Sequence, residues 1–147
     1  MNSTRIEKLG EYLELILETL NSSYKKINAD FLGLDINNYS LDKIPTASTV
    51  ETWITGDKIC RDVYSFRSRN VYSSDRIENL KNIGFFEQFE SIIQSNNDGG
   101  ILPDIQGIQS IECLNCGSVN TANTKTCEMD IQIQVTYKEE RNETNSK

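Results

Sequence analysis

The hydrophobic positions of this chain follow helical spacing in two segments and strand spacing in several others. Near the N-terminus, apolar side chains recur every three or four residues, which predicts a helix over residues 4–21 with one buried stripe. The stripe consists of Ile6, Leu9, Leu13, Ile16, Leu17 and Leu20. Thr4 and Glu7 have the spacing of a capping box, in which side chains bond two free backbone N–H groups of the first turn.

A second helical pattern begins near Ser74 and ends in the polar run 96–100. Its apolar positions fall into two groups: Ile77, Leu80 and Ile83, then Phe86, Phe89, Ile92 and Ile93. Gly84 lies between the groups and costs about 1 kcal/mol relative to alanine inside a helix. We therefore expect a kink at Gly84, or a break into two short helices.

Strand-like segments lie between the two helices. Short extended pieces are expected at 26–32 and 39–44, the second ending at Pro45. Residues 50–55 and 58–68 predict a hairpin, with Gly56-Asp57 as a two-residue type II′ turn. Alternation in its longer strand places Cys60, Asp62, Tyr64 and Phe66 on one face, and Arg61, Val63 and Arg67 on the other.

The last pair of predicted strands covers residues 108–114 and 126–137, joined by a polar connection. The second of these alternates strictly between apolar and polar residues, which is typical of an antiparallel strand with one wet face. Together the elements predict a single α+β domain over residues 1–138, with a mostly antiparallel sheet and two main helices packed on one face. Residues 139–147 are expected to form a flexible polar tail.

The 147-residue chain carries a net charge of −7, which argues against binding nucleic acid or an anionic membrane. It has no apolar run near 18 residues and no signal-like N-terminus, so we expect neither a membrane span nor secretion. In a reducing compartment its four cysteines are expected to be free thiols.

Cys113 and Cys116 have the spacing of half a zinc site. Cys127 and Cys60 would complete a four-cysteine site only if the fold brought them together, so these four are weak metal candidates. We expect small buried hydrophobes instead, and no cofactor. The chain has no histidine, which excludes a Ser-His-Asp triad and most catalytic zinc sites. No carboxylate pair or phosphate loop stands out, so we do not expect an enzyme.

Arginine and aromatic residues concentrate around the central hairpin: Arg61, Arg67, Arg69, Tyr64 and Trp53. They fit a solvated strand face, a nucleic-acid stripe or an interface between subunits. We favour the interface, because guanidinium groups and tyrosines are enriched there and the acidic surplus supplies partners on identical subunits. Trp53 fits either the core or an interface anchor, and the core is slightly favoured.

Four stretches carry a resemblance to a known family: residues 52–57 (TWITGD), 62–69 (DVYSFRSR), 82–89 (NIGFFEQF) and 131–137 (IQIQVTY). Their order and spacing over about residues 5–138 resemble the tail terminator, or minor capsid, proteins of phages and phage-tail-like particles of Gram-positive bacteria. The Cys-x-x-Cys pair is not part of that pattern.

The resemblance implies a non-enzymatic subunit of a homohexameric ring that caps the head-proximal end of a tail tube and stops its polymerisation. Its implied partners are sister subunits, the tail tube protein, and the sheath and head–tail connector proteins, with DNA only passing through the lumen. The implied location is a virion or a headless bacteriocin-like particle assembled in the bacterial cytoplasm. Alternatives are a head–tail connector or stopper protein, and a small zinc-binding regulatory module.

Overall fold

We describe the fold from a computed structural model that covers residues 4–20, 27–29, 39–45, 49–71, 76–115, 118–122 and 126–140. Two helices and seven strands occur in these ranges. They are, in chain order, α1 (Arg5–Leu20), β1 (Ile27–Ala29), β2 (Tyr39–Ile44), β3 (Thr49–Thr52), β4 (Lys58–Val71), α2 (Arg76–Asp98), β5 (Ile108–Cys113), β6 (Ser118–Ala122) and β7 (Thr126–Glu139). Residues 141–147 of the predicted tail lie outside the described residues.

The sheet is built around the two long strands β4 and β7, which pair antiparallel over fourteen residues, from Lys58 opposite Glu139 to Val71 opposite Thr126. β2 and β3 pair with the free edge of β4, and β5 and β6 pair with the free edge of β7. Only β1, which pairs with β2, is parallel to its neighbour. The predicted fold class, a mostly antiparallel α+β domain, is therefore confirmed.

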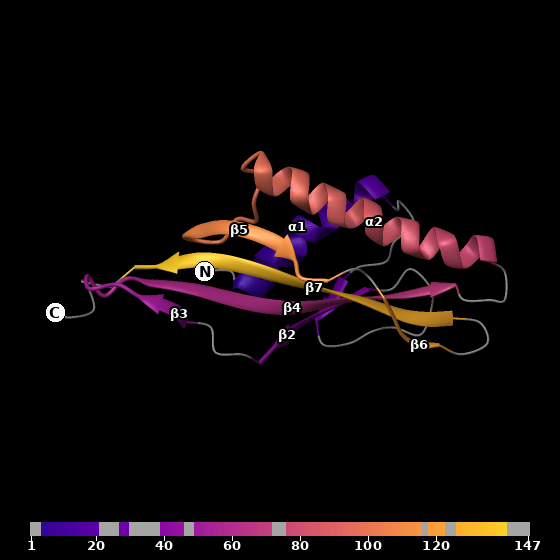
Figure 1. The fold of residues 1–147 in the computed structure, drawn as a ribbon, viewed down its shortest axis with the longest axis horizontal. Coiled ribbons are helices and arrows are strands. Elements are labelled where there is room, and N and C mark those ends of the chain that lie inside the picture. Colours follow the sequence, from indigo (N-terminus) through magenta and orange to yellow (C-terminus); the bar gives the residue numbers. More distant parts are fainter. Residues whose placement is uncertain are drawn as a thin grey trace.

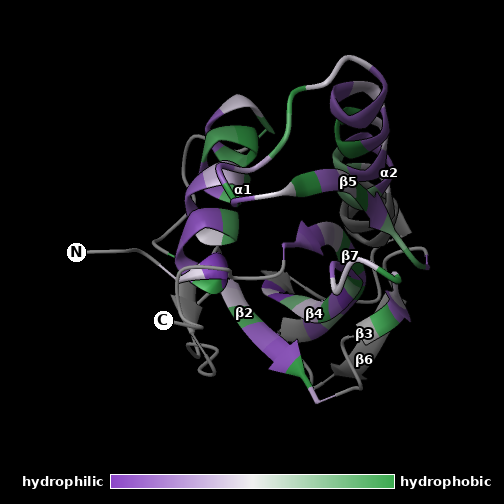
Figure 2. Cartoon of the chain, turned by 90° about the vertical axis from the view of Figure 1, so that its left-hand side faces the viewer, coloured by the Kyte–Doolittle hydropathy of each residue, from purple (hydrophilic) through white to green (hydrophobic). Residues whose placement is uncertain are grey.

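Both helices lie on the same side of the sheet (Figure 1), side by side above the strands (Figure 2). We call this side the helix-covered face and the opposite side the outer face. Strand alternation assigns Asp62, Tyr64 and Phe66 of β4 to the helix-covered face, and these side chains are at most 1% exposed. Arg61 and Arg67 lie on the outer face, as the sequence predicts.

Helix α1 begins as its capping box predicts. The Thr4 backbone N–H donates to Glu7 Oε1, and the Glu7 backbone N–H donates to Thr4 Oγ1, each at 3.3 Å. Leu9, Tyr12, Leu13, Ile16 and Leu17 form the buried stripe. Tyr12 was not predicted in it; its hydroxyl donates to the backbone oxygen of Ile101 at 2.9 Å, so the ring is buried while its polar end is bonded.

Helix α2 runs without a break from Arg76 to Asp98, so a division into two short helices at Gly84 is wrong. A glycine in a helix weakens it but does not end it when neighbouring side chains pack, and Phe86 and Phe89 next to it are buried. The helix ends in a Schellman motif. Gly100 has a φ of 76°, and the Ile101 N–H donates to the oxygen of Asn96 at 2.8 Å.

The β3–β4 hairpin is confirmed, but its predicted two-residue turn is wrong. The Trp53 N–H donates to the oxygen of Asp57 at 2.7 Å, and the Gly56 N–H donates to the oxygen of Trp53 at 2.9 Å. Gly56 has a φ of 94°. This is a three-residue loop, a turn followed by a bulged glycine, in which Gly56 takes the left-handed third position.

The C-terminal region contains one strand more than predicted. Residues 118–122, within the predicted connection, form β6 beside β7, so β7 is a central strand and not the edge of a hairpin. β5 lies at the edge of the sheet, and its Ile111 N–H donates to Asn97 Oδ1 of α2 at 3.0 Å. At this position a side chain occupies the backbone donor that an added strand would need.

The core between the sheet and α2 is centred on stacked aromatic rings. Phe66 of β4 stacks on Tyr39 of β2 at 5.4 Å and on Phe89 of α2 at 5.1 Å between ring centroids. Phe85 and Phe86 pack edge to face beside them. Rings in these arrangements contribute beyond their buried area, so the cluster fixes α2 over the middle of the sheet.

Gly107 provides a test of how closely the segment before β5 packs against β7. It has a φ of 77°, and a Cβ atom there would overlap the backbone oxygen of Lys138 in β7. We expect Gly107→Ala to lower the free energy of unfolding by about 2–4 kcal/mol in urea denaturation. The control is Gly10→Ala within α1, where nothing lies near an added Cβ and a gain of up to about 1 kcal/mol is expected. Equal stability of the two variants would contradict this account.

Candidate functional site

The structure separates the five side chains that the sequence groups as an interface. Trp53 and Arg61 lie exposed near the β3–β4 turn, whereas Tyr64 is 1% exposed on the helix-covered face. Arg67 and Arg69 are half-buried further along the outer face. The five therefore do not form one surface, and only Trp53 and Arg61 belong to the same exposed end of the sheet.

We name that exposed surface the hairpin end and define it as Val50, Trp53, Ile54 and Arg61. Its apolar members are exposed: Val50 is 50% exposed, Trp53 39% and Ile54 104%. The slight preference for Trp53 in the core is thus wrong. Trp53 follows the last paired residue of β3, and the turn lies at the far end of the long strands, beyond the helices (Figure 1).

Trp53 is held in place although it is exposed. The Lys138 ammonium lies 4.9 Å from the centre of its ring and 3.6 Å from Asp57 Oδ2. A cation over an aromatic face and an ion pair at the base of the loop both restrict the ring. An aromatic side chain that is ordered before binding loses less conformational entropy in a contact, which favours its use as an anchor.

Arg67 has its carboxylate partners within its own chain. Its Nε lies 2.6 Å from Asp42 Oδ2 of β2, and its Nη1 lies 3.5 Å from Glu128 Oε1 of β7. Its Nη2 also donates to Ser40 Oγ at 3.3 Å. These contacts cross three adjacent strands, so the guanidinium joins β2, β4 and β7 on the outer face.

A buried polar cluster under α1 was not singled out by the sequence. Asp62 is 1% exposed, and its Oδ2 lies 3.0 Å from Arg5 Nε and 3.7 Å from Lys43 Nζ. The hydroxyls of Tyr64 and Tyr137 each donate to its carboxylate at 3.4 Å. The sequence contains one signal for this cluster. Alternation in β4 places the Asp62 carboxylate among apolar neighbours, and a carboxylate buried there requires polar partners.

The cluster joins four elements at one point, because its residues come from α1, β2, β4 and β7. Arg5 also lies 4.5 Å from the centre of the Tyr137 ring. Burial, and then the nearby charge of Asp62, raise the pKa of Tyr64 to about 12. The same two causes raise the pKa of Tyr137. Both tyrosines are therefore neutral hydrogen-bond donors, and the cluster fixes the first turn of α1 to the sheet.

The strand register excludes a four-cysteine zinc site. The Cys60 backbone pairs with Tyr137 and the Cys127 backbone with Asn70, which places them ten residues apart along β4, or about 33 Å. Ligands of one zinc lie within about 4 Å of one another. Cys60 is buried, Cys113 is half-buried, and both are free thiols. Cys116 lies outside the described residues, as does the side chain of Cys127.

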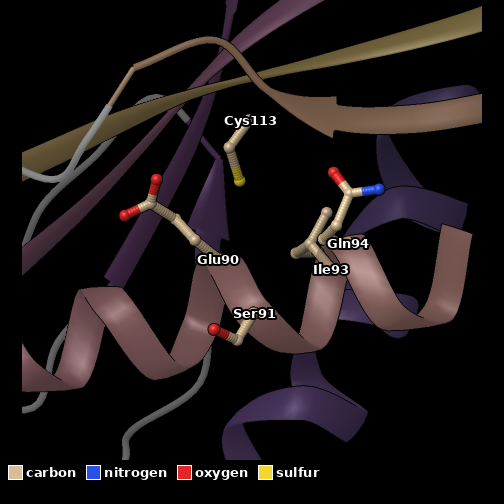
Figure 3. Close-up of a pocket in the computed structure, with 5 residues that line it drawn as sticks. All are labelled: Glu90, Ser91, Ile93, Gln94 and Cys113. Atoms are coloured by element: carbon tan, nitrogen blue, oxygen red, sulfur yellow. The ribbon is translucent and has the colours of Figure 1, made fainter.

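A shallow hollow of about 250 Å³ lies between α2 and β5 (Figure 3). It is lined by Glu90, Ser91, Ile93, Gln94 and Cys113. The Cys113 thiol points towards α2, with Glu90 and Gln94 on either side (Figure 3). One thiol and one carboxylate are fewer ligands than a zinc ion requires. In the part of the chain that the structure describes, no group of three or more potential ligands has a metal-binding arrangement.

Comparison of the sequence with models of known protein families and with curated proteins gave no match. Within the described ranges, neither helix has the length and apolar character needed to span a membrane. The features that can support a function are therefore the chain's own: the hairpin end, the buried cluster around Asp62 and the arrangement of the sheet.

The buried cluster predicts that Arg5 stabilises the fold more than an exposed lysine of the same helix does. Arg5→Met removes the closest cation from buried Asp62, and we expect a loss of about 2–3 kcal/mol in urea denaturation. The matched control is Lys8→Met, which removes ion pairs to exposed Glu11 and Asp104 and is expected to cost less than about 1 kcal/mol. Losses of the same size in both variants would contradict a structural role of the cluster.

The raised pKa of Tyr64 predicts a loss of stability at alkaline pH. The tyrosine ionises near its ordinary value of 10.0 in the unfolded chain but only near 12 in the folded one. Its contribution is therefore complete below pH 10 and is lost as the pH rises towards 12. Thermal unfolding followed between pH 9 and 12 is expected to show a shallower decline for Tyr64→Phe than for the wild type. Parallel curves would argue against this origin.

Proposed function

We propose that this chain is a structural subunit of a phage tail or phage-tail-like particle, acting as a tail terminator or collar. In this role a homohexameric ring of subunits caps the head-proximal end of the tail tube and stops its polymerisation. The resemblance of the sequence to tail terminator proteins suggests this role. The α+β architecture that the resemblance implies is the architecture that the described residues adopt.

The observation that carries the proposal is the exposed hairpin end. Val50, Trp53 and Ile54 gather apolar area at the tip of the sheet, although the core has its own complete set of large side chains. Clustered apolar exposure of this kind marks contact sites between proteins, whereas scattered exposed residues do not. The ordering of Trp53 by Lys138 supports the same use.

At β5 and β7 the sheet favours association through side chains over added strands. The Ile111 N–H of edge strand β5 is already bonded by Asn97, and β7 is paired on both sides. A projecting hairpin that meets a different surface on its neighbour is suited to a ring, because a closed ring is made of heterologous contacts. In the proposed particle the partners are sister subunits, the tail tube protein, and sheath and connector proteins.

The net charge of −7 fits a ring through which DNA passes. Acidic walls repel the phosphate backbone, so DNA in the lumen would slide without binding. The proposal therefore assigns no base-reading or phosphate-binding role to the arginines of β4.

Deletion of the gene in its parent phage or particle producer tests the proposal. We expect tail tubes that are several times longer than normal or have open head-proximal ends in negative-stain images, because polymerisation is no longer stopped. Restoring the wild-type chain is expected to return the normal length, whereas an Ile54→Asp chain is not. Tubes of normal length after deletion would refute the proposal, and normal tubes that fail to join heads would favour the connector role.

A further inference from the structure

The hairpin end carries a cation that is available to a partner. Arg61 is exposed on the outer face and has no ion pair among the described residues, and its register partner on β7 is the uncharged Thr136. Lys58 also has no ion pair among the described residues, but strand alternation places it on the opposite, helix-covered face. The other cations whose side chains the structure describes have a contact within the chain: Arg5, Lys8, Lys43, Arg67, Arg69 and Lys138.

The outward side of α1 has the opposite character. Four glutamates at positions 7, 11, 14 and 18 fall on one stripe of the helix, because their spacing of three and four residues matches the helical repeat. Leu15 lies beside this stripe and is 64% exposed. Glu14 and Glu18 have no ion pair among the described residues. Like charges at this spacing destabilise a helix slightly, and a cationic partner would relieve that repulsion.

The two surfaces are complementary both in their apolar side chains and in their charge. The hairpin end offers apolar Trp53 and Ile54 beside Arg61, and α1 offers apolar Leu15 beside Glu14 and Glu18. The turn lies at one end of the long axis, beyond the N-terminal end of α1 (Figure 1). The cluster around Asp62 fixes the first turn of α1 to the sheet with its glutamate stripe facing outward, so the two surfaces do not meet within one chain.

We propose that the hairpin end of one copy of this chain binds the outward face of α1 on a second copy. Ile54 and Trp53 then cover Leu15, while Arg61 faces Glu14 and Glu18. The contact uses two different patches, so each copy can bind two neighbours, and repetition closes a ring if the rotation between copies permits. This inference rests on the proposed ring function and assigns its subunit contact.

Photo-crosslinking identifies the surface that Ile54 touches. A benzophenone amino acid at position 54 of the full chain is irradiated under conditions in which the wild type self-associates, and the crosslinked peptides are sequenced by mass spectrometry. We expect crosslinks to residues 5–20 of a second copy. The matched control carries the photo-crosslinker at Leu114, which is 44% exposed at the end of β5 and lies outside both surfaces, and should give none there. Crosslinks from position 54 to another surface, or their absence, would overturn the inference.

Charge reversal tests the same contact by a different readout. Arg61→Glu, and separately Glu14→Lys with Glu18→Lys, are each expected to weaken self-association about tenfold in sedimentation velocity runs. Combining all three changes is expected to restore most of the lost association, because the charges are again opposite. A merely unfolded variant would not be rescued, and circular dichroism checks each fold. Failure of the combined variant to recover would overturn the pairing.

The outcomes separate this inference from the proposed function. Wild-type chain that self-associates while all these variants associate equally well would overturn the hairpin–α1 contact but leave the ring. Normal tail length after gene deletion would refute the terminator role while leaving the crosslink as evidence of self-association. A wild type that stays monomeric at every concentration, and gives no crosslink, would overturn the contact.

Discussion

The fourteen-residue pairing of β4 with β7 is the constraint on which the rest of the structure depends. Because this register is uninterrupted, alternate residues of both strands keep to one face over the whole length. One face receives the helices and the aromatic rings of Tyr39, Phe66 and Phe89. The same pairing holds the β3–β4 turn beyond the helix layer, which is why its apolar side chains remain uncovered.

The buried carboxylate of Asp62 shows how a polar group can define an orientation. An apolar side chain at this position would pack without directional requirements, whereas a buried carboxylate needs several donors in definite places. Arg5, Lys43 and the hydroxyls of Tyr64 and Tyr137 supply them from four elements. The N-terminal turn of α1 is thereby fixed, and with it the direction in which the acidic side of that helix faces.

Two arginines of one strand face have different surroundings, and this difference bears on assembly. Arg67 lies in the middle of the sheet, where β2 and β7 bring Asp42 and Glu128 within reach. Arg61 lies near the turn, where no described carboxylate pairs with it. Position along the strand, and not residue type, thus separates an arginine that holds the sheet together from one available to a partner. The proposed contact between copies depends on that availability.

The sequence alone determined α1 with its capping box, the alternation in β4 and β7, and the α+β class, because these depend on local spacing and on burial of one face. Only the tertiary structure decided the surroundings of individual residues. Gly84 lies in an unbroken helix because neighbouring phenylalanines pack, and Trp53 is exposed because its loop extends past the helices. Cys60 and Cys127 lie too far apart for one metal, since strand register, which links residues distant in sequence, is not encoded in local pattern.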